Sequence, residues 1–229
     1  MSAPLTLLGG AALGMAAGSL LVPLTRRELA ASVARSSSSS ASVATTEAAP
    51  RVSTGHWVAL AAASGLLPAY VLHRVGWSII ALPPLLLLVG LVQLAYCDLT
   101  RCLLPKTLVY ALSAAVFVSG VVIAGVMHEW QRLLVAGLGA VAFFALFFVI
   151  NLMNPRWMAF GDVRLSLVVG FGLAWVSPIA LLEGFFLANL LAAVVGFALI
   201  AARRAERGFA VPFGFYLALG AALVLVTWS

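Results

Sequence analysis

Residues 133–153 read LLVAGLGAVAFFALFFVINLM, an apolar run in which Asn151 is the one strongly polar side chain. A helix of about 20 such residues crosses the hydrocarbon core of a bilayer and satisfies its backbone polar groups internally. Comparable runs recur at 4–24, 57–73, 77–97, 107–127, 163–181, 184–202 and 212–228. They are too long and too uniformly apolar for barrel strands. The sequence therefore predicts an all-α, polytopic membrane helix bundle with about eight transmembrane helices.

The overall composition agrees with a membrane protein. Hydrophobic residues make up 64% of the 229 residues, charged residues make up 9%, and the mean hydropathy is +1.14. Soluble domains carry about 25% charged residues, so an ordinary soluble protein is excluded. The net charge of +6 is explained by basic loops at an anionic lipid surface. We therefore expect the lipid bilayer, and no nucleic acid, as a partner.

The basic residues are unevenly distributed among the predicted loops. All but two of the thirteen Lys and Arg fall in the loops that follow the first, third, fifth and seventh runs, and the exceptions are Arg74 and Arg132. Cytoplasmic loops are enriched in Lys and Arg. This asymmetry predicts a multi-pass membrane protein, with those loops in the cytoplasm and both termini outside.

The chain contains only two aspartates, Asp98 and Asp162, and each adjoins an end of a predicted span on the cytoplasmic side. Taken singly, each fits a structural role better, Asp162 as a helix cap and Asp98 as a partner of Arg101. Taken together, two carboxyls at matching depth on neighbouring inner loops are candidates for paired acid–base chemistry.

The two cysteines, Cys97 and Cys102, have neither the C-x-x-C spacing of a zinc site nor the number needed for a disulfide framework. The three histidines are scattered at span edges without ligand spacing. No metal and no cofactor is therefore predicted.

Three stretches in order along the chain, DLTRCLLP at 98–105, MAFGDVRL at 158–165 and VPFG at 211–214, resemble motifs of the bacterial type IV prepilin peptidases. The stretch DLTRCLLP at 98–105 resembles the family's first aspartate motif, in which an Ile-Pro dipeptide follows six residues after the Asp. The stretch MAFGDVRL at 158–165 resembles its G-x-G-D motif, with Ala159 in place of the first Gly. The stretch VPFG at 211–214 resembles the Pro-Phe-Gly turn that opens the last helix, and Phe215 replaces a proline that is common after it. Lys106 stands where the family usually has Asn or Asp.

This resemblance implies a membrane-embedded aspartic endopeptidase with Asp98 and Asp162 as catalytic residues. The implied partner is a prepilin-like protein with a short basic leader, cut at the cytoplasmic membrane boundary just before its hydrophobic helix. The resemblance also implies a role in type IV pili or protein secretion and a location in the inner (plasma) membrane. One carboxyl would hold a proton while the other activates water.

The resemblance and the composition together divide the chain into three parts. We expect a first transmembrane helix at 1–29, a flexible Ser/Thr-rich cytoplasmic linker at 30–55 and the membrane peptidase domain at 56–229. Many family members carry two C-x-x-C pairs between the first two spans, a module that accompanies N-methylation. The corresponding part of this chain has no cysteine, so methyltransferase activity is not predicted.

Two other functions stay open at this point. An ion-coupled membrane transporter also uses carboxylates in a helix bundle, although its sites tend to lie near the bilayer midplane. An inactive relative that serves as a scaffold for pilus or secretion machinery would have the same sequence pattern.

Overall fold

The computed structural model describes most of the chain beyond the predicted linker. The described residues are Pro23, Arg27, 54–75, 78–101, 105–154, 158–202 and 213–227. Apart from Pro23, the predicted first span lies outside these ranges, as does nearly all of the predicted linker. Within them every regular element is a helix, which confirms the all-α prediction.

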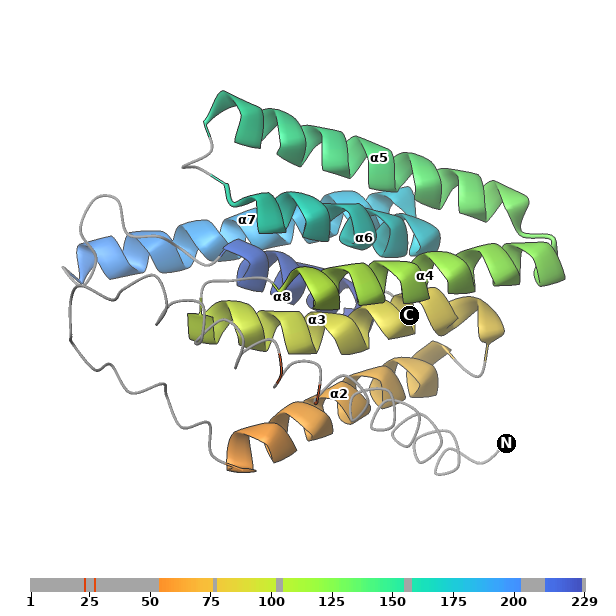
Figure 1. The fold of residues 1–229 in the computed structure, drawn as a ribbon, viewed down its shortest axis with the longest axis horizontal. Helices are drawn as coiled ribbons and strands as arrows, with labels where there is room; N and C mark the ends of the chain where they lie inside the picture. The colour runs from red at the N-terminus through yellow and green to blue at the C-terminus, as the bar shows by residue number, and fades with distance from the viewer. Residues whose placement is uncertain are drawn as a thin grey trace.

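Seven α-helices and one short 3₁₀ turn form the described part. They are α2 (Thr54–Val75), η1 (Ile79–Ala81), α3 (Leu82–Arg101), α4 (Lys106–Met127), α5 (Trp130–Met153), α6 (Phe160–Val176), α7 (Pro178–Ala201) and α8 (Phe213–Thr227). Successive helices run in opposite directions along the bundle (Figure 1). The end of α3 and the beginnings of α4, α6 and α8 consequently lie at the same end of the molecule.

Four stretches of helix within the described ranges are long and apolar enough to cross a membrane. They are Ile79–Leu99, Lys106–Met127, Trp130–Met153 and Pro178–Ala201. α6 and α8 have 17 and 15 residues, and at 1.5 Å per residue they are shorter than a hydrocarbon core of about 30 Å. The protein is a polytopic membrane protein, whereas the predicted number of eight spans is not established by these helices.

One predicted boundary is displaced. The run at 163–181 was expected to be a single span, but α6 ends at Val176 and α7 begins at Pro178. Ser177 has extended backbone angles and its Oγ accepts a hydrogen bond of 3.1 Å from the Ile179 amide. A serine cap followed by proline at the first helical position starts a new helix. The apolar run continues through this break, so hydropathy alone does not reveal it.

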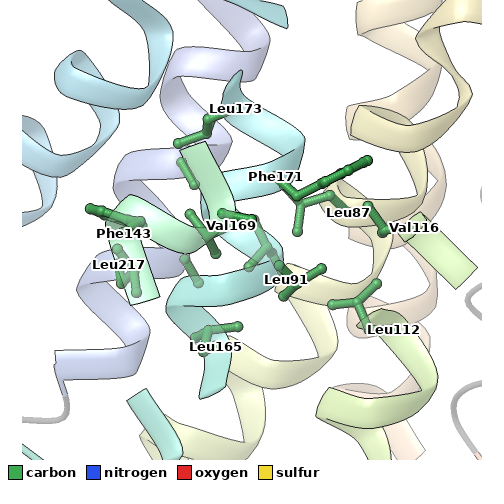
Figure 2. Packing of buried hydrophobic residues seen from close by; sticks show 14 of the residues in the cluster. Leu87, Leu91, Leu112, Val116, Phe143, Leu165, Val169, Phe171, Leu173 and Leu217 are labelled. Atoms are coloured by element: carbon green, nitrogen blue, oxygen red, sulfur yellow. The ribbon is translucent and has the colours of Figure 1, made fainter. Parts of the chain in front are cut away.

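α6 lies at the centre of the bundle. It packs against α3, α4, α5, α7 and α8, and most of its side chains from Val163 to Trp175 are buried. A helix that is apolar on every face is expected in such a position. Figure 2 shows its side chains among those of four neighbouring helices, α3, α4, α5 and α8. The central position of α6 is what brings its first turn close to the ends of other helices.

Glycine allows α5 and α6 to approach closely. A Cβ atom at Gly170 would lie 2.8 Å from the Gly139 carbonyl oxygen and 3.1 Å from Ala140 Cα. Both obstacles are backbone atoms of α5, so neither can move aside without shifting the helix. Close backbone approach through small residues is the usual means by which helices associate in lipid. This contact sets the position of α6 in the bundle.

Candidate active site

Asp98 lies near the end of α3, with its side chain only 5% exposed. The preceding residue, Cys97, is fully buried, whereas Leu99 is 54% exposed. This helix end therefore directs Asp98 into the protein and Leu99 outward. An isolated buried carboxylate is unfavourable, so the groups around Asp98 decide whether its carboxyl is ionised or protonated.

The first turn of α8 supplies a partner for Asp98. The backbone N–H of Phe215 donates a hydrogen bond of 2.7 Å to Asp98 Oδ2. The first amides of a helix have no acceptor within the helix, and a carboxylate at this end is also favoured by the helix dipole. The first turn of α8 is thereby joined to the end of α3, from 117 residues away in the sequence.

Asp162 lies in the first turn of α6 and is likewise 5% exposed. Its N-cap, Ala159, has φ −71° and ψ 144°, an extended conformation that alanine adopts without strain. Alanine therefore fits at this position although the resembling family motif has glycine there. The Asp162 amide donates a 3.0 Å hydrogen bond to the Ala159 carbonyl, which closes the turn.

Asn151 holds the segment that precedes this turn. Its Nδ2 donates a hydrogen bond of 2.7 Å to the Met158 carbonyl. Asn151 is near the end of α5, so the bond ties α5 to the start of the Asp162 motif. The lone polar residue in the apolar run 133–153 is the sequence signal for this contact, although its partner could not be inferred from the sequence.

The structure brings the two aspartates together at one end of the bundle. Asp162 precedes the apolar part of α6, and burial raises its pKa to about 7, with the negative charge of Asp98 contributing and backbone hydrogen bonding at Ala159 opposing. A charge acts in this way only over short distances in a protein. α3 also packs against α6, so the two buried carboxyls lie close enough for the charge of Asp98 to raise the pKa of Asp162.

Other predicted site features differ in how far the structure describes them. The side chain of Arg101 and all of Cys102 lie outside the described residues, so the alternative pairing of Asp98 with Arg101 is not tested. The guanidinium of Arg164 lies 4.5 Å from the ring centre of Phe160 and 5.7 Å from that of Tyr110, as in cation–π contacts. Among the described residues no three His, Cys, Asp or Glu are grouped for metal binding.

The Phe215 amide is the part of this site that sequence reasoning missed. Every residue except proline has a backbone N–H, so this donor cannot be recognised from the type of amino acid. The Pro-Phe-Gly sequence, which predicts a helix start, is the one signal that could have indicated it. The pairing of that helix start with Asp98 depends on how α3 packs against α8, which the sequence pattern does not specify.

Several known proteins are similar to this chain, three of which are compared with it below. A protein of Stutzerimonas stutzeri named prepilin leader peptidase/N-methyltransferase is 30% identical over 170 residues, 73% of this chain and 56% of that protein. A protein of the same name from Pseudomonas aeruginosa is 28% identical over 167 residues, 72% of this chain and 56% of its own length. One from Aeromonas salmonicida is 30% identical over 153 residues, 66% of this chain and 50% of its own length.

The chain spans about half the length of the curated relatives it matches. No solved structure matches it. The sequence pattern of the type IV leader peptidase family matches residues 85–200, a range that contains both Asp98 and Asp162. This match covers half of the chain and confirms the resemblance drawn from the motifs. The chain belongs to the type IV leader peptidase family.

Proposed function

We propose that this protein is a membrane-embedded aspartic endopeptidase that removes the basic leader peptide from prepilin-like proteins. The observation that carries the proposal is the pair of buried aspartates at one end of the bundle, where burial and, second to it, the charge of Asp98 raise the pKa of Asp162 to about 7. Two carboxyls coupled in this way share one proton near neutral pH. Membership of the type IV leader peptidase family supports the same reaction.

The reaction follows from the shared proton. The ionised carboxyl takes a proton from water as the water oxygen bonds to the scissile carbonyl carbon. The protonated carboxyl donates a hydrogen bond to the carbonyl oxygen and stabilises the tetrahedral intermediate. The carbon–nitrogen bond then breaks, and the leaving amine takes up the proton that the first carboxyl received from water, which restores the pair. No metal or cofactor is needed for this sequence of steps.

We infer the kind of substrate from the surroundings of the aspartates. Leu99 is 54% exposed and Phe160 is 44% exposed, and they flank Asp98 and Asp162 respectively in the sequence. These exposed apolar side chains can pack against a hydrophobic helix of the substrate, which would then lie beside the carboxyls. Packing contacts of this kind drive the association of helices in lipid. The names of the relatives supply the prepilin class of substrate. The proposal does not include methyl transfer, because the sequence has only two cysteines, at 97 and 102.

We place the aspartate end of the bundle on the cytoplasmic side of the inner membrane. Lys106 and Arg164 lie at this end, at the starts of α4 and α6. Arg74 and Arg132 lie at the opposite end. The positive-inside rule supports this orientation. In this arrangement the residues at 1–29 form an additional membrane helix, 30–55 a cytoplasmic linker and 56–229 the peptidase domain.

Cleavage of a reconstituted substrate tests the proposal. The purified protein in detergent is incubated with a polypeptide that has a short basic leader followed by a hydrophobic helix. We expect cleavage at the boundary, and we expect both Asp98→Asn and Asp162→Asn to lower the rate by about 10²- to 10⁴-fold, since each removes a group that transfers or holds a proton. Mass spectrometry of the products identifies the bond.

Glu183→Gln is the matched control, because this acidic residue is exposed on α7 and is not part of the pair. It should cleave at the rate of the unmodified protein. Cleavage that survives either aspartate substitution would reject the pair. A protein that does not cleave but carries ions down a gradient in vesicles would be a transporter, and one with neither activity would be a scaffold.

A further inference from the structure

A cavity of about 270 Å³ lies at the end of the bundle opposite to the aspartates. Its walls come from the end of α2, η1, the start of α3 and the ends of α6 and α8, and Arg132 at the start of α5 completes them. This end of the bundle is on the right in Figure 1. Much of the wall is apolar, formed by Val71, Pro84, Leu85, Leu88 and Leu225. The proposed peptidase reaction uses none of these residues.

Trp175 holds one wall of the cavity in a fixed position. Its side chain is 1% exposed, and its indole N–H donates a hydrogen bond of 2.9 Å to the Ile80 carbonyl. This bond joins the end of α6 to η1, and the Trp175 ring also stacks on Phe171, with 5.8 Å between the ring centres. Because the indole N–H is already bonded, Trp175 contributes apolar surface to the cavity. The cavity is therefore largely preformed, as ligand sites usually are.

A second cavity, of about 260 Å³, adjoins the first and is more polar. Arg132 and Trp175 line both cavities. The second cavity is also lined by Glu129, Gln131 and Ser177. An apolar space next to a polar one matches an amphiphilic molecule, with a hydrocarbon chain in the first cavity and a polar head group in the second. Arg132 then lies where the chain meets the head group.

The arginines at this end indicate the chemistry of the head group. Arg74 and Arg132 are the two basic residues that fall outside the predicted cytoplasmic loops. Arg132 lines both cavities, and Arg74 follows the lining residue Val71 by about one helical turn. Nε of Arg132 lies 3.5 Å from Glu129 Oε2, and a guanidinium has further N–H groups on its two terminal nitrogens. Two parallel N–H groups match the oxygens of a phosphate.

The size and place of the cavity indicate a lipid and not a helix of another protein segment. An α-helix with its side chains is about 10 Å across, so a helix cannot enter a space of about 270 Å³. A hydrocarbon chain is narrow enough to do so. Ala81 and Leu85 in the wall are only partly buried, so the cavity is accessible from outside the protein. The end of a membrane bundle is also the depth at which lipid head groups lie.

We infer that the two cavities form a binding site for one phospholipid, whose hydrocarbon chain lies against Trp175 and whose phosphate is bound by Arg132. The site is separate from the aspartates and does not depend on the proposed peptidase function. In the orientation proposed above, the lipid comes from the outer leaflet of the membrane. Arg132 thereby has a function on the side where Lys and Arg are rare.

Photochemical labelling tests the phosphate contact. The full chain, purified in a maltoside detergent, is irradiated with phosphatidylglycerol that carries a diazirine on one acyl chain, or with diacylglycerol that carries the same chain. Mass spectrometry locates the attached lipid. We expect phosphatidylglycerol to attach to residues 78–88 and 171–176, and diacylglycerol to attach there about tenfold less. Arg132→Gln should remove this preference, since a hydrogen bond to a charged group contributes about a tenfold difference in affinity.

Lys106→Gln is the matched control for the charge, because it removes an exposed basic side chain at the aspartate end. It should be labelled as the unmodified protein is. Ala81→Phe tests the cavity itself, since the larger side chain would fill the space that Ala81 lines, and it should abolish the attachment. Ala142→Phe makes the same change at an exposed position of α5 and should leave the attachment unchanged.

Thermal unfolding gives a second measurement that does not depend on the photochemistry. A ligand that binds only the folded protein raises its Tm. Unlabelled phosphatidylglycerol should therefore raise the Tm of the unmodified protein and of Ala142→Phe, but not that of Arg132→Gln or Ala81→Phe. Circular dichroism checks that the helices are retained in each variant.

Three results would overturn the inference. Equal attachment of the two lipids in the unmodified protein would show that no phosphate is recognised. Attachment spread over the exposed faces of the helices, without enrichment at the cavity, would mean ordinary contact with lipid. A cavity that another segment of the chain covers would leave both lipids unattached at residues 78–88 and 171–176, and phosphatidylglycerol would then raise the Tm of all variants equally or of none.

Discussion

Two effects of different kinds raise the pKa of Asp162. Burial in the first turn of α6 is the larger cause, because the ionised form loses the water that would stabilise it. The negative charge of Asp98 is the second cause, and backbone hydrogen bonding at Ala159 acts in the opposite direction. With a pKa of about 7, Asp162 is protonated below neutral pH and ionises as the pH rises through 7. Cleavage should therefore decline on the alkaline side of about pH 7.

The two causes can be separated by removing one of them. Asp98→Asn deletes the neighbouring charge and leaves Asp162 buried, so the pKa of Asp162 should fall below about 7 without returning to the ordinary range of an aspartate. In protein that contains aspartate labelled with ¹³C at the carboxyl, the NMR signal of Asp162 is followed from pH 4 to pH 9. The midpoint of its shift gives the pKa of Asp162 directly. Glu129→Gln at the opposite end of the bundle should leave that midpoint in place. An Asp162 midpoint that Asp98→Asn does not change would mean that the carboxyls are too far apart to act as a pair.

At the scale of elements, the contact between α5 and α6 positions Asp162. α6 approaches α5 where Gly170 faces the Gly139 carbonyl, and the Asn151 amide donates a hydrogen bond to the Met158 carbonyl, just before α6. The packing contact fixes α6 about two turns beyond Asp162, and the hydrogen bond fixes the backbone at Met158, just before the first turn. A shift of α6 relative to α5 would move Asp162 relative to Asp98.

We predict that Gly170→Ala destabilises the protein by about 1 to 3 kcal/mol, because its Cβ would lie 2.8 Å from a backbone oxygen that cannot rotate away. Gly137→Ala is the matched control on α5, since a Cβ there meets nothing within 4 Å. It should be neutral or stabilising by up to about 1 kcal/mol, the advantage of alanine over glycine in a helix. Thermal unfolding in detergent, followed by circular dichroism, compares the two. Equal Tm values for both variants would show that the close approach is not important.

The helix pattern and the boundary between α6 and α7 differ in how far the sequence predicts them. Long apolar runs predict helices because lipid leaves backbone groups no other partners, and seven of the eight predicted runs contain helices in the described part. The break at Ser177 and Pro178 was missed because both flanking helices are apolar. Hydropathy measures how apolar a segment is, whereas the break depends on a serine cap and on proline geometry.

At the scale of the whole molecule, alternation of helix direction explains why the site could be predicted in part. With short connections, the end of α3 and the start of α6 must lie at the same end of the bundle (Figure 1). The sequence therefore predicted that Asp98 and Asp162 share a side. Their coupling also requires α6 to pack against α3, and the Phe215 contact requires α8 to do so. Which helices lie next to one another depends on the shapes of the side chains that pack between them, and the periodicity and charge of the sequence do not specify those shapes.

The orientation of the whole bundle is the remaining prediction, and single cysteines test it. In a background with Cys97→Ala and Cys102→Ala, Glu129→Cys lies between α4 and α5, and Lys106→Cys lies at the aspartate end. Both positions have solvent-accessible side chains. Since most Lys and Arg lie in the predicted loops at the aspartate end, a membrane-impermeant maleimide should label Glu129→Cys in intact cells and Lys106→Cys only after permeabilisation. Detergent-solubilised protein, in which both cysteines should react, is the control for access. The reverse pattern in cells would place the aspartates outside, where a basic leader retained in the cytoplasm could not reach them.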